Sequence, residues 1–283
     1  MFREPLKFPE HTLPKKDLPP SVFSSKTLKI ISFMKKILFV LIILLPTATW
    51  AQQSFEGMAR YLVTHNWTKK LEAVPYISKQ QKERSAYMWG NDSEWKLYNN
   101  LYFNATTSKF DNSEDKADPN DDNRWAERTE LFFMKRDFAN NSMTDAIEFL
   151  GKNYLIEDEI PPIDWKIQND LKEVAGHICM KAFTEDTLRN QKIVAWFAQD
   201  IPLSIGPDRF SGLPGMILEI DINDGAMIMS ADKIELKKLT TELDVPKKIK
   251  SKKIKYAEYH DLEKKFILEK RKEESFPFWG IRY

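Results

Sequence analysis

Short runs of alternating apolar and polar residues follow one another from residue 55 onward, and an alternation of this kind has the period of β-strands. The runs that predict strands most clearly are Phe55–His65, Trp95–Phe103, Ile163–Asn169, Val174–Phe183 and Gln191–Ala198. The segment Asp145–Ile156 predicts two shorter strands that meet at Gly151-Lys152. Because short charged or glycine-containing turns separate these runs, the pattern indicates an antiparallel sheet and not a βαβ fold.

The clearest hairpin is predicted between residues 216 and 231. Its first strand places Glu219 and Asp221 on one face and a row of apolar side chains on the other, formed by Met216, Leu218, Ile220 and Ile222. Asp224-Gly225 then has the composition of a type I′ turn, which needs positive φ at both central residues. The chain is expected to return as a second strand over Ala226–Ala231.

The segment Val245–Ser275 alternates blocks of lysine with blocks of glutamate, which predicts a charged tail or helix. A set of apolar side chains within it comes close to the spacing of one helix face: Tyr256, Tyr259, Leu262, Phe266 and Leu268. Together these patterns predict a mainly β chain with few helices. Its core is expected to be a single curved antiparallel sheet or half-barrel, with a closed barrel as the alternative.

A loop with a high density of glycine and proline comes directly before the Met216 strand. Its ten residues include Gly206, Pro207, Gly212, Pro214 and Gly215. The four residues from Leu213 to Met216 match a type II turn, in which proline presets the first central residue and glycine accepts positive φ at the second. Two roles fit this composition: a structural loop that turns the chain into the strand, and a loop that gates a ligand or binds a partner.

The hexapeptide Gly212-Leu213-Pro214-Gly215-Met216-Ile217 resembles the hallmark of the GLPGLI family, exported proteins of Bacteroidetes without an established biochemical role. Met216 stands where that family usually has leucine. A second pattern, Gly176, Cys179 and Ala182, is also similar to the family's. The resemblance covers the Trp165–Ala182 and Trp196–Ile220 regions. A half-barrel similar to periplasmic lipoprotein carriers such as LolA is the shape we expect, by analogy at the level of the fold.

The N-terminal part of the chain predicts export. Lys35-Lys36 precede the apolar run 37–45, and Thr49 and Ala51 occupy the small-residue positions of a signal peptide over residues 34–51 that is cut near Ala51. Residues 1–33 are rich in proline and scattered charges, and we expect a disordered extension or an over-long gene start. The mature chain, 52–283, is then expected to be one domain in the periplasm or outside the cell.

The charge and the cysteine content of the chain limit which partners and which covalent links are expected. The mature chain has 35 basic and 39 acidic residues, so nucleic acid is not expected as a partner. Cys179 is the only cysteine, which rules out an intramolecular disulfide. A buried thiol is the expected role of Cys179, and a copper site with His177 and Met180 is the alternative.

Motifs of several enzyme classes are absent from the sequence. The loop has no Gly-Lys-Ser/Thr, no G-x-G-x-x-G and no G-x-S-x-G, and the chain has no H-x-x-x-H or C-x-x-C. The acidic segment Asp111–Asn123 lacks the glycine and glutamate of a calcium loop and is expected to be solvated. We therefore predict no metal and no cofactor.

Two classes of function remain open. The first is a non-enzymatic binding or accessory protein of the cell envelope, whose partner is an outer-membrane or other envelope protein or an apolar ligand; Trp196, Asp208 and Arg209 are its candidate contacts. The alternative is an envelope hydrolase with a polar site around the loop. That site requires Asp200, Asp208, Arg209 and His177 within hydrogen-bond reach of one another.

Overall fold

The computed structural model describes residues 56–90, 93–117, 131–246 and 248–283. Its strands form a 12-stranded sheet in the order β12-β6-β5-β4-β3-β2-β1-β11-β10-β9-β8-β7. The bounds are β1 Gly57–Asn66, β2 Glu94–Phe103, β3 Thr107–Asn112, β4 Phe132–Asp137, β5 Ser142–Phe149, β6 Lys152–Glu159, β7 Lys166–Val174, β8 His177–Asp186, β9 Gln191–Ala198, β10 Met216–Ile222, β11 Met227–Leu236 and β12 Lys252–Ile254. The predicted signal peptide and extension lie outside the described residues.

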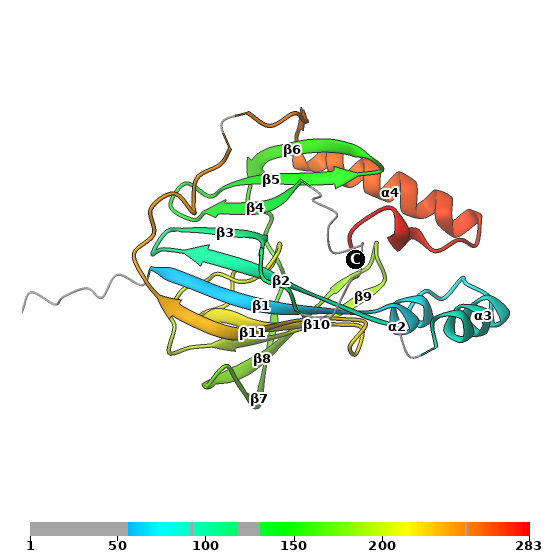
Figure 1. Ribbon diagram of the computed structural model, residues 1–283, viewed down its shortest axis with the longest axis horizontal. Coiled ribbons are helices and arrows are strands. Elements are labelled where there is room, and N and C mark those ends of the chain that lie inside the picture. The colour runs from blue at the N-terminus through cyan, green and yellow to red at the C-terminus, as the bar shows by residue number, and fades with distance from the viewer. Residues whose placement is uncertain (1–55, 91–92, 118–130, 247) are drawn as a thin grey trace, which may run out of the picture. The chain divides into compact units, whose positions relative to one another are not determined.

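Helices are few and lie at one end of the sheet (Figure 1). They are α2 (Trp67–Glu72), α3 (Lys79–Trp89), α4 (Tyr256–Lys272) and the short 3₁₀ helix η2 (Pro277–Trp279). Within the described ranges, each helix is too short or too polar to cross a bilayer.

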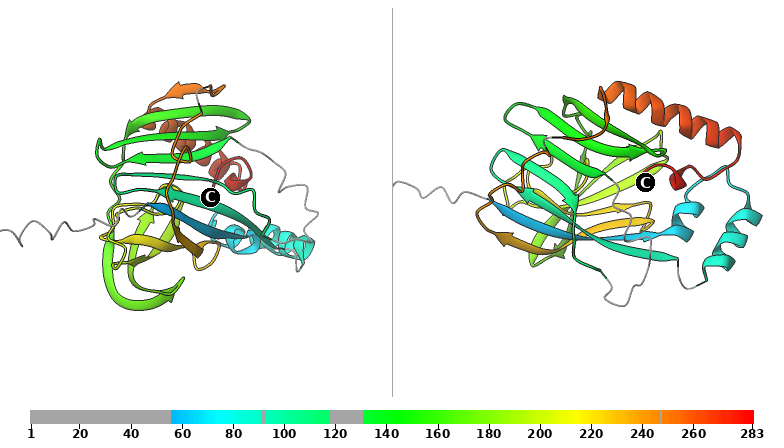
Figure 2. Two further views of the ribbon diagram at one scale, coloured as in Figure 1. Left: turned by 60° about the vertical axis from the view of Figure 1, so that its left-hand side comes forward. Right: turned by 45° about the horizontal axis from the view of Figure 1, so that its top comes forward.

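The sheet is open and strongly curved (Figures 1 and 2). Its edge strands, β12 and β7, do not pair with each other, so the barrel does not close. Every neighbouring pair is antiparallel except β12 and β6, which run parallel. The prediction of a mainly β chain built on one curved sheet is therefore confirmed, with the correction that the sheet is mixed at its β12 edge.

The inner face of the sheet forms the core. Along strands such as β1, apolar side chains that point to this face alternate with side chains on the outer face, as the sequence pattern predicts. In β1, Ala59, Tyr61 and Val63 are buried while Arg60 and Leu62 on the other face are only partly so. The buried Tyr61 hydroxyl donates a hydrogen bond of 2.6 Å to the Ile217 carbonyl of β10, and this satisfies its polar tip inside the core.

Three segments from outside the sheet cover this inner face. Helix α4 packs on β5 and β6, where the ring of Phe149 lies 5.9 Å from the rings of both Tyr259 and Phe266. The loop 199–215 and the C-terminal segment 276–283 supply the other apolar groups of the same core cluster, with Phe210 and Phe278 among them. The right-hand view of Figure 2 shows α4 and the C-terminal segment on this side of the sheet.

The observed elements extend the predicted set. The two predicted strands are present, but the turn between them is Leu150-Gly151, at φ values of 51° and 75°, and not Gly151-Lys152, because Lys152 already pairs with Phe149. The strands β3, β4 and β12 and the helices α2 and α3 were not predicted, and β12 lies in a segment that was expected to be a charged tail or helix. Short length and weak alternation explain the omission of β4, since Phe132, Phe133 and Met134 are all buried in succession.

The predicted hairpin is confirmed, but its turn is longer than a type I′ turn. Ile222 pairs with Met227, which leaves four residues between the strands. Asn223, Asp224 and Gly225 all have positive φ, and the Ala226 amide donates to the Ile222 carbonyl at 3.0 Å. Asparagine, aspartate and glycine tolerate this conformation best, which is why they stand there.

Helix α4 confirms the predicted C-terminal helix, although its buried stripe is displaced from the predicted one. Its buried residues are Tyr259, Glu263 and Ile267, whereas Tyr256 and Leu268 are exposed. The prediction is confirmed for Tyr259, Leu262 and Phe266, which pack on the core, and is wrong for Tyr256 and Leu268. It followed apolar side chains alone and therefore missed the buried Glu263.

Ile267 and Leu268 give a matched test of this stripe. Ile267 is 2% exposed and Leu268 is 39% exposed. We expect Ile267→Ala to lower the free energy of unfolding by about 2–4 kcal/mol through loss of buried methyl groups and the cavity left behind. Leu268→Ala should change it by less than about 0.5 kcal/mol. Urea denaturation followed by circular dichroism measures both; equal costs would contradict the observed orientation of α4.

Candidate functional site

The glycine- and proline-rich loop lies inside the core for most of its length. Ile201, Ile205, Phe210 and Leu213 are all buried. Its backbone is satisfied locally: the Met216 amide donates to the Ile201 carbonyl, the Ile217 amide to Ile205, and the Gly212 amide to Ser204. The indole of Trp165 also donates to the Ser211 carbonyl at 2.9 Å. The loop is thus a packed element of the core.

The predicted type II turn at Leu213–Met216 is wrong. The Gly215 amide donates to the Leu213 carbonyl at 2.8 Å, which closes a tighter three-residue turn, and the φ of Gly215 is 159°. Glycine is needed there for a different reason, since a Cβ on Gly215 would lie 2.3 Å from the Ala198 carbonyl oxygen. The same crowding applies at Gly206, where a Cβ would lie 2.8 Å from the Cβ of Ile217.

Asp208 and Arg209 form the hydrogen-bonded turn of the loop. The Phe210 amide donates to the Pro207 carbonyl at 3.1 Å, and Asp208 has a φ of 55°. The Asp208 carboxylate accepts the Arg209 amide at 2.7 Å, which stabilises this unusual conformation locally. The turn directs the carboxylate into the protein, where its side chain is only 4% exposed.

A set of buried and half-buried charged groups crosses the inner face, and we call it the internal polar network. It consists of Asp186, Arg189, Gln191, Asp208, Arg209, Glu263 and Arg282. Arg189 lies in the β8–β9 turn. Its guanidinium is 2.5 Å from a carboxylate oxygen of Asp186, at the end of β8, and also 2.5 Å from one of Glu263, in α4. Arg282 contacts Asp208 at 3.2 Å, and Arg209 donates to Gln191 at 3.0 Å. Arg189 therefore ties a turn of the sheet to α4, and Asp208 ties the loop to the C-terminal segment. The two groups lie close enough for Arg209 to lower the pKa of Asp186.

The network favours the charged form of two of its carboxylates, Asp186 and Asp208. Burial alone would raise the pKa of Asp208, but the guanidinium groups of Arg282 and Arg209 outweigh burial and lower that pKa below its usual value. The pKa of Asp186 is lowered in the same way, against burial, chiefly by Arg189 and Arg209. These shifts arise from ion pairs that the fold itself uses, so they do not mark a catalytic acid or base.

The four residues of the predicted hydrolase site do not come together. His177 Nδ1 lies 2.6 Å from Asp200 Oδ2, and this pair is partly exposed. Asp208 and Arg209 belong to the internal polar network. No hydrogen bond or ion pair joins the two sets among the described residues. The hypothesis of one polar site around the loop is therefore not supported by this arrangement.

Cys179 and Trp196 lie on the outer face of the β8–β9 region. Cys179 is fully buried, and burial raises the pKa of its thiol to about 11, which makes it a poor nucleophile. Trp196 is half-buried and lies below the ammonium groups of Lys172 and Lys181, at 5.6 and 6.0 Å from its ring. Within the described ranges, no group of three or more histidine, cysteine or acidic residues is placed to hold a metal ion.

Lys70 and His65 form a buried pair that reasoning from the sequence missed. The Lys70 side chain is almost fully buried, and its Nζ lies 2.5 Å from His65 Nδ1. Burial and the nearby Arg282 lower the pKa of Lys70 well below its usual value, and burial with Lys70 lowers the pKa of His65 likewise. The only signal in the sequence is indirect, since Lys70 follows aromatic Trp67 at the spacing of one helical turn.

Comparison with known proteins adds little about chemistry. A family model described as "Protein of unknown function (Porph_ging)" matches residues 184–219, which include β9 and the loop. No curated protein matches the chain.

Solved structures that resemble the chain include two crystal forms titled as PNGF-II, with 13% identity and TM-scores of 0.48 and 0.47. In each comparison the matched region includes 73% of this chain. It includes only 32% and 33% of the two PNGF-II chains. An uncharacterized conserved protein from Thermus thermophilus has 8% identity and a TM-score of 0.33, with coverage of 70% of this chain and 90% of its own. Likeness at this level says nothing of activity.

The loop needs glycine at position 215 because another backbone segment lies close to it, and at position 212 because φ is positive there. Substitution by alanine at each position compares the two effects. A Cβ on Gly215 would overlap the Ala198 carbonyl, whereas a Cβ on Gly212, at φ 94°, meets no atom within 4 Å. We expect Gly215→Ala to cost about 2–4 kcal/mol of stability, and Gly212→Ala about 1 kcal/mol from backbone strain alone. Thermal unfolding measures both, and a larger cost at Gly212 would show that strain is what matters in this loop.

Removal of one carboxylate should show how far the fold depends on the internal polar network. Glu263→Gln leaves Arg189 buried with one anionic partner, and we expect a loss of about 3 kcal/mol. Glu258→Gln, on the exposed side of the same helix, is the matched control and should be nearly neutral. Urea denaturation of both variants gives the comparison, and a neutral Glu263→Gln would mean that Arg189 finds enough compensation elsewhere.

Proposed function

We propose that this chain is an exported, non-enzymatic accessory protein that binds a partner protein of the cell envelope through the surface at the α3 end of the sheet. Export is inferred from the signal peptide predicted over residues 34–51. The binding role is supported by one observation above all: α3 is a well-defined helix that buries none of its own residues.

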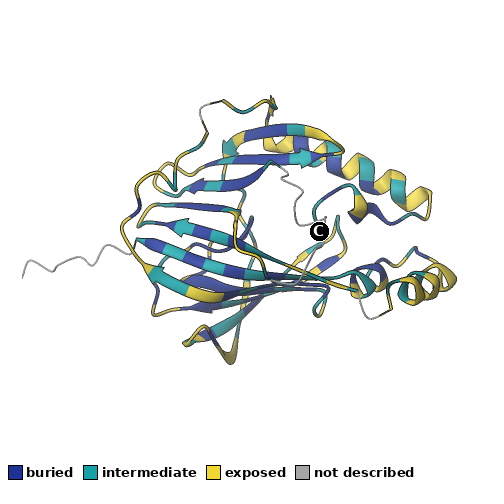
Figure 3. Cartoon of the chain, viewed as in Figure 1, coloured by how far each residue is buried: buried dark blue, intermediate teal, exposed yellow. Residues whose placement is uncertain are grey.

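The sequence specifies α3 carefully at both ends. Ser78 and Gln81 form a capping box at the start, and Gly90 ends the helix at a φ of 53°. Yet the helix has only 11 residues, a length at which an isolated helix is marginal in water. Figure 3 shows no buried residue along it, in contrast to the buried stripe of α4. A helix this short normally gains its stability by packing one face against other parts of a protein. For α3, a bound partner can supply such contacts.

The end surface comprises Tyr87, Met88, Trp89, Leu150 and Trp279. Tyr87 is 89% exposed, and Met88, Trp279 and Leu150 are also largely exposed. Trp279 of η2 holds the surface together: its ring stacks on Trp67 at 4.9 Å and meets Trp89 edge-on at 5.9 Å. Aromatic residues and methionine are enriched at protein interfaces, and clustered exposure of this kind is typical of a binding surface.

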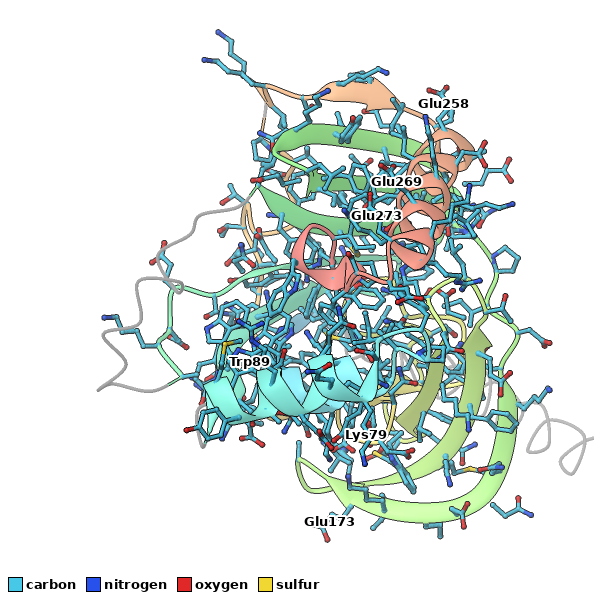
Figure 4. All side chains as sticks on the ribbon, turned by 90° about the vertical axis from the view of Figure 1, so that its right-hand side faces the viewer. Lys79, Trp89, Glu173, Glu258, Glu269 and Glu273 are labelled. Atoms are coloured by element: carbon cyan, nitrogen blue, oxygen red, sulfur yellow. The ribbon has the colours of Figure 1, made fainter. Side chains whose placement is uncertain are left out.

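The charges around the end surface favour a protein over a lipid surface. On α3, Lys79 and Arg84 are exposed. At the C-terminal end of α4, the exposed Glu269 and the C-cap residue Glu273 stand beside the exposed Arg271 and Lys272, so the charges at this end are mixed (Figure 4). An anionic membrane selects clustered Lys and Arg, and carboxylates at the rim would oppose it. A mixed polar rim around an aromatic centre is the usual anatomy of a protein interface.

The two alternatives have weaker support. An apolar ligand on the inner face would have to displace the loop or the C-terminal segment, which bury that face in the described structure. A hydrolase would need another site than the one predicted, because His177-Asp200 and Asp208-Arg209 belong to different networks. Trp196 also lies outside the end surface and is not used in this proposal.

Site-specific photo-crosslinking in the native envelope tests the end surface directly. A benzophenone side chain in place of Tyr87 should cross-link one defined envelope protein, and Met88→Glu should reduce that yield by about tenfold, because it buries a charge in the centre of the interface. Since α3 buries no residue, Met88→Glu should leave the melting temperature unchanged.

The matched control uses Leu171, which is 65% exposed on the edge strand β7. A benzophenone at Leu171 should not capture the same protein, and Leu171→Glu should not alter the yield from Tyr87. Cross-linking of the same partner from both positions, or products with lipid only, would exclude the proposed surface.

A further inference from the structure

The corner of the molecule beneath the end surface contains a buried lysine next to a partly buried histidine, and no carboxylate of the described residues contacts either of them. Lys70 of α2 is 1% exposed, and its Nζ lies 2.5 Å from His65 Nδ1 at the end of β1. The ammonium nitrogen also lies 4.2 Å from the ring of Trp67 and 4.7 Å from the ring of Tyr283. Lysine is almost never fully buried without an anionic partner, so this arrangement needs an explanation.

Of the other charged groups near this corner, Asp224 is exposed and the rest are held by other contacts. Arg282, from the C-terminal segment, is an additional cation close to Lys70 and is paired with Asp208 of the loop. In the adjacent β10–β11 turn, the Asp221 carboxylate accepts the Gly225 amide, and the Asp224 carbonyl accepts Lys69. The Tyr283 hydroxyl accepts from Asn223 at 2.7 Å, and burial raises its pKa to about 12, so it stays neutral.

We infer that Lys70 and His65 form a proton-operated latch that holds the C-terminal segment 276–283 on the sheet at neutral pH and releases it in acid. This inference rests on the proposed function for its biological meaning, because the segment carries Trp279 of the end surface. The latch itself is a property of the free protein.

The geometry allows only one proton between the two nitrogens. At 2.5 Å, one nitrogen donates and the other must offer a lone pair. When His65 and Lys70 are both fully protonated, two N–H groups face each other beside Arg282, and the contact must open. The rings of Trp67 and Tyr283 stabilise one ammonium group through cation–π contacts. They cannot offset the mutual repulsion of three cations, protonated His65, protonated Lys70 and Arg282.

The direction of the pH dependence follows from linkage. Burial and neighbouring cations lower the pKa of both groups, and the docked segment supplies one of those cations, Arg282, and part of the cover through the ring of Tyr283. Release of the segment removes that contribution, so the released state binds more protons and gains population as the pH falls. The ordinary pKa of histidine is 6.5, so the step contributed by His65 falls below that pH. If docking lowers the pKa of a group by one pH unit, protonation of that group shifts the equilibrium between docked and released segment about tenfold toward release. The full shift is reached when the pH is below the pKa of the group in both states.

Trp279 connects the latch to the end surface. It follows Phe278, whose ring lies 4.7 Å from that of Tyr283, and it stacks on Trp67, three residues before Lys70. Movement of residues 276–283 away from α2 therefore removes Trp279 from Trp67 and Trp89. A partner bound to the end surface at neutral pH should be released in acid.

Hydrogen exchange of the full chain tests the latch without any partner. Between pH 7.5 and pH 5.0, after correction for intrinsic exchange, peptides covering 276–283 should lose protection by about tenfold or more, while β1 and β2 keep theirs. Lys70→Met keeps the contacts with both rings and removes the second base, so this acid response should largely disappear. Lys69→Met is the matched control, since Lys69 contacts only the Asp224 carbonyl, and it should respond like the natural chain.

His65→Phe provides a second variant if Lys70→Met does not fold. Phenylalanine can keep the stack with Trp67 and Trp95 while removing the imidazole, and the acid step should again be lost. Equal loss of protection in the natural chain and in both variants, or no loss in the natural chain, would overturn the latch.

Photo-crosslinking from Tyr87 at the two pH values separates the two proposals. A yield that falls several-fold in acid for the natural chain, but not for Lys70→Met, supports control of the end surface by the latch. An unchanged yield despite acid release of the segment overturns that control and leaves the proposed function intact. If no defined partner is captured at neutral pH, the proposed function fails, and hydrogen exchange alone still decides whether the latch exists.

Discussion

The ion pair between Arg189 and Glu263 is the interaction on which the arrangement of this protein depends most. An open curved sheet leaves its apolar inner face uncovered unless other parts of the chain are fixed over it. Arg189 stands in the turn between β8 and β9, toward one edge of the sheet, whereas Glu263 belongs to α4, which packs on β5 and β6 toward the other. The pair therefore joins the two sides across the concave face, in place of the hydrogen bonds that close a barrel.

The same network explains why the loop and the C-terminal segment behave as parts of the core. Asp208 is buried at the tip of a turn and is neutralised by Arg282, which comes from the C-terminal segment and lies 3.5 Å from the ring of Phe132. A buried charge that loses its partner costs several kcal/mol, so loop and segment depend on each other. Lys70 departs from this pattern of matched charges, and it does so where the C-terminal segment meets α2.

Much of the sheet could be predicted from the sequence because alternation reports burial on one face directly. It works for β1 and for the hairpin of β10 and β11, but it fails for β4, where Phe133 packs into a small second cluster on the other face. The glycines of the loop were identified correctly as special, yet the reason at Gly215 was wrong, because contact with Ala198 is not visible in local sequence. Of the internal polar network, only Asp208 and Arg209 were identified from the sequence as candidate polar residues. The pairs Arg189–Glu263 and Arg282–Asp208 each join residues 74 positions apart, and no local pattern distinguishes Glu263 from the exposed glutamates of α4.

Helix α3 shows why the fold and the proposed function are not independent. Its capping residues specify a helix, while two of its apolar side chains, Tyr87 and Met88, face outward and only Trp89 packs against the core cluster. Local sequence and core packing therefore disagree at this element. Such a disagreement between levels is expected at a functional surface. Trp279 lies against this element and belongs to the segment whose other residues complete the core. The surface is therefore presented only while the C-terminal segment is docked, and whatever weakens the docking also weakens the surface.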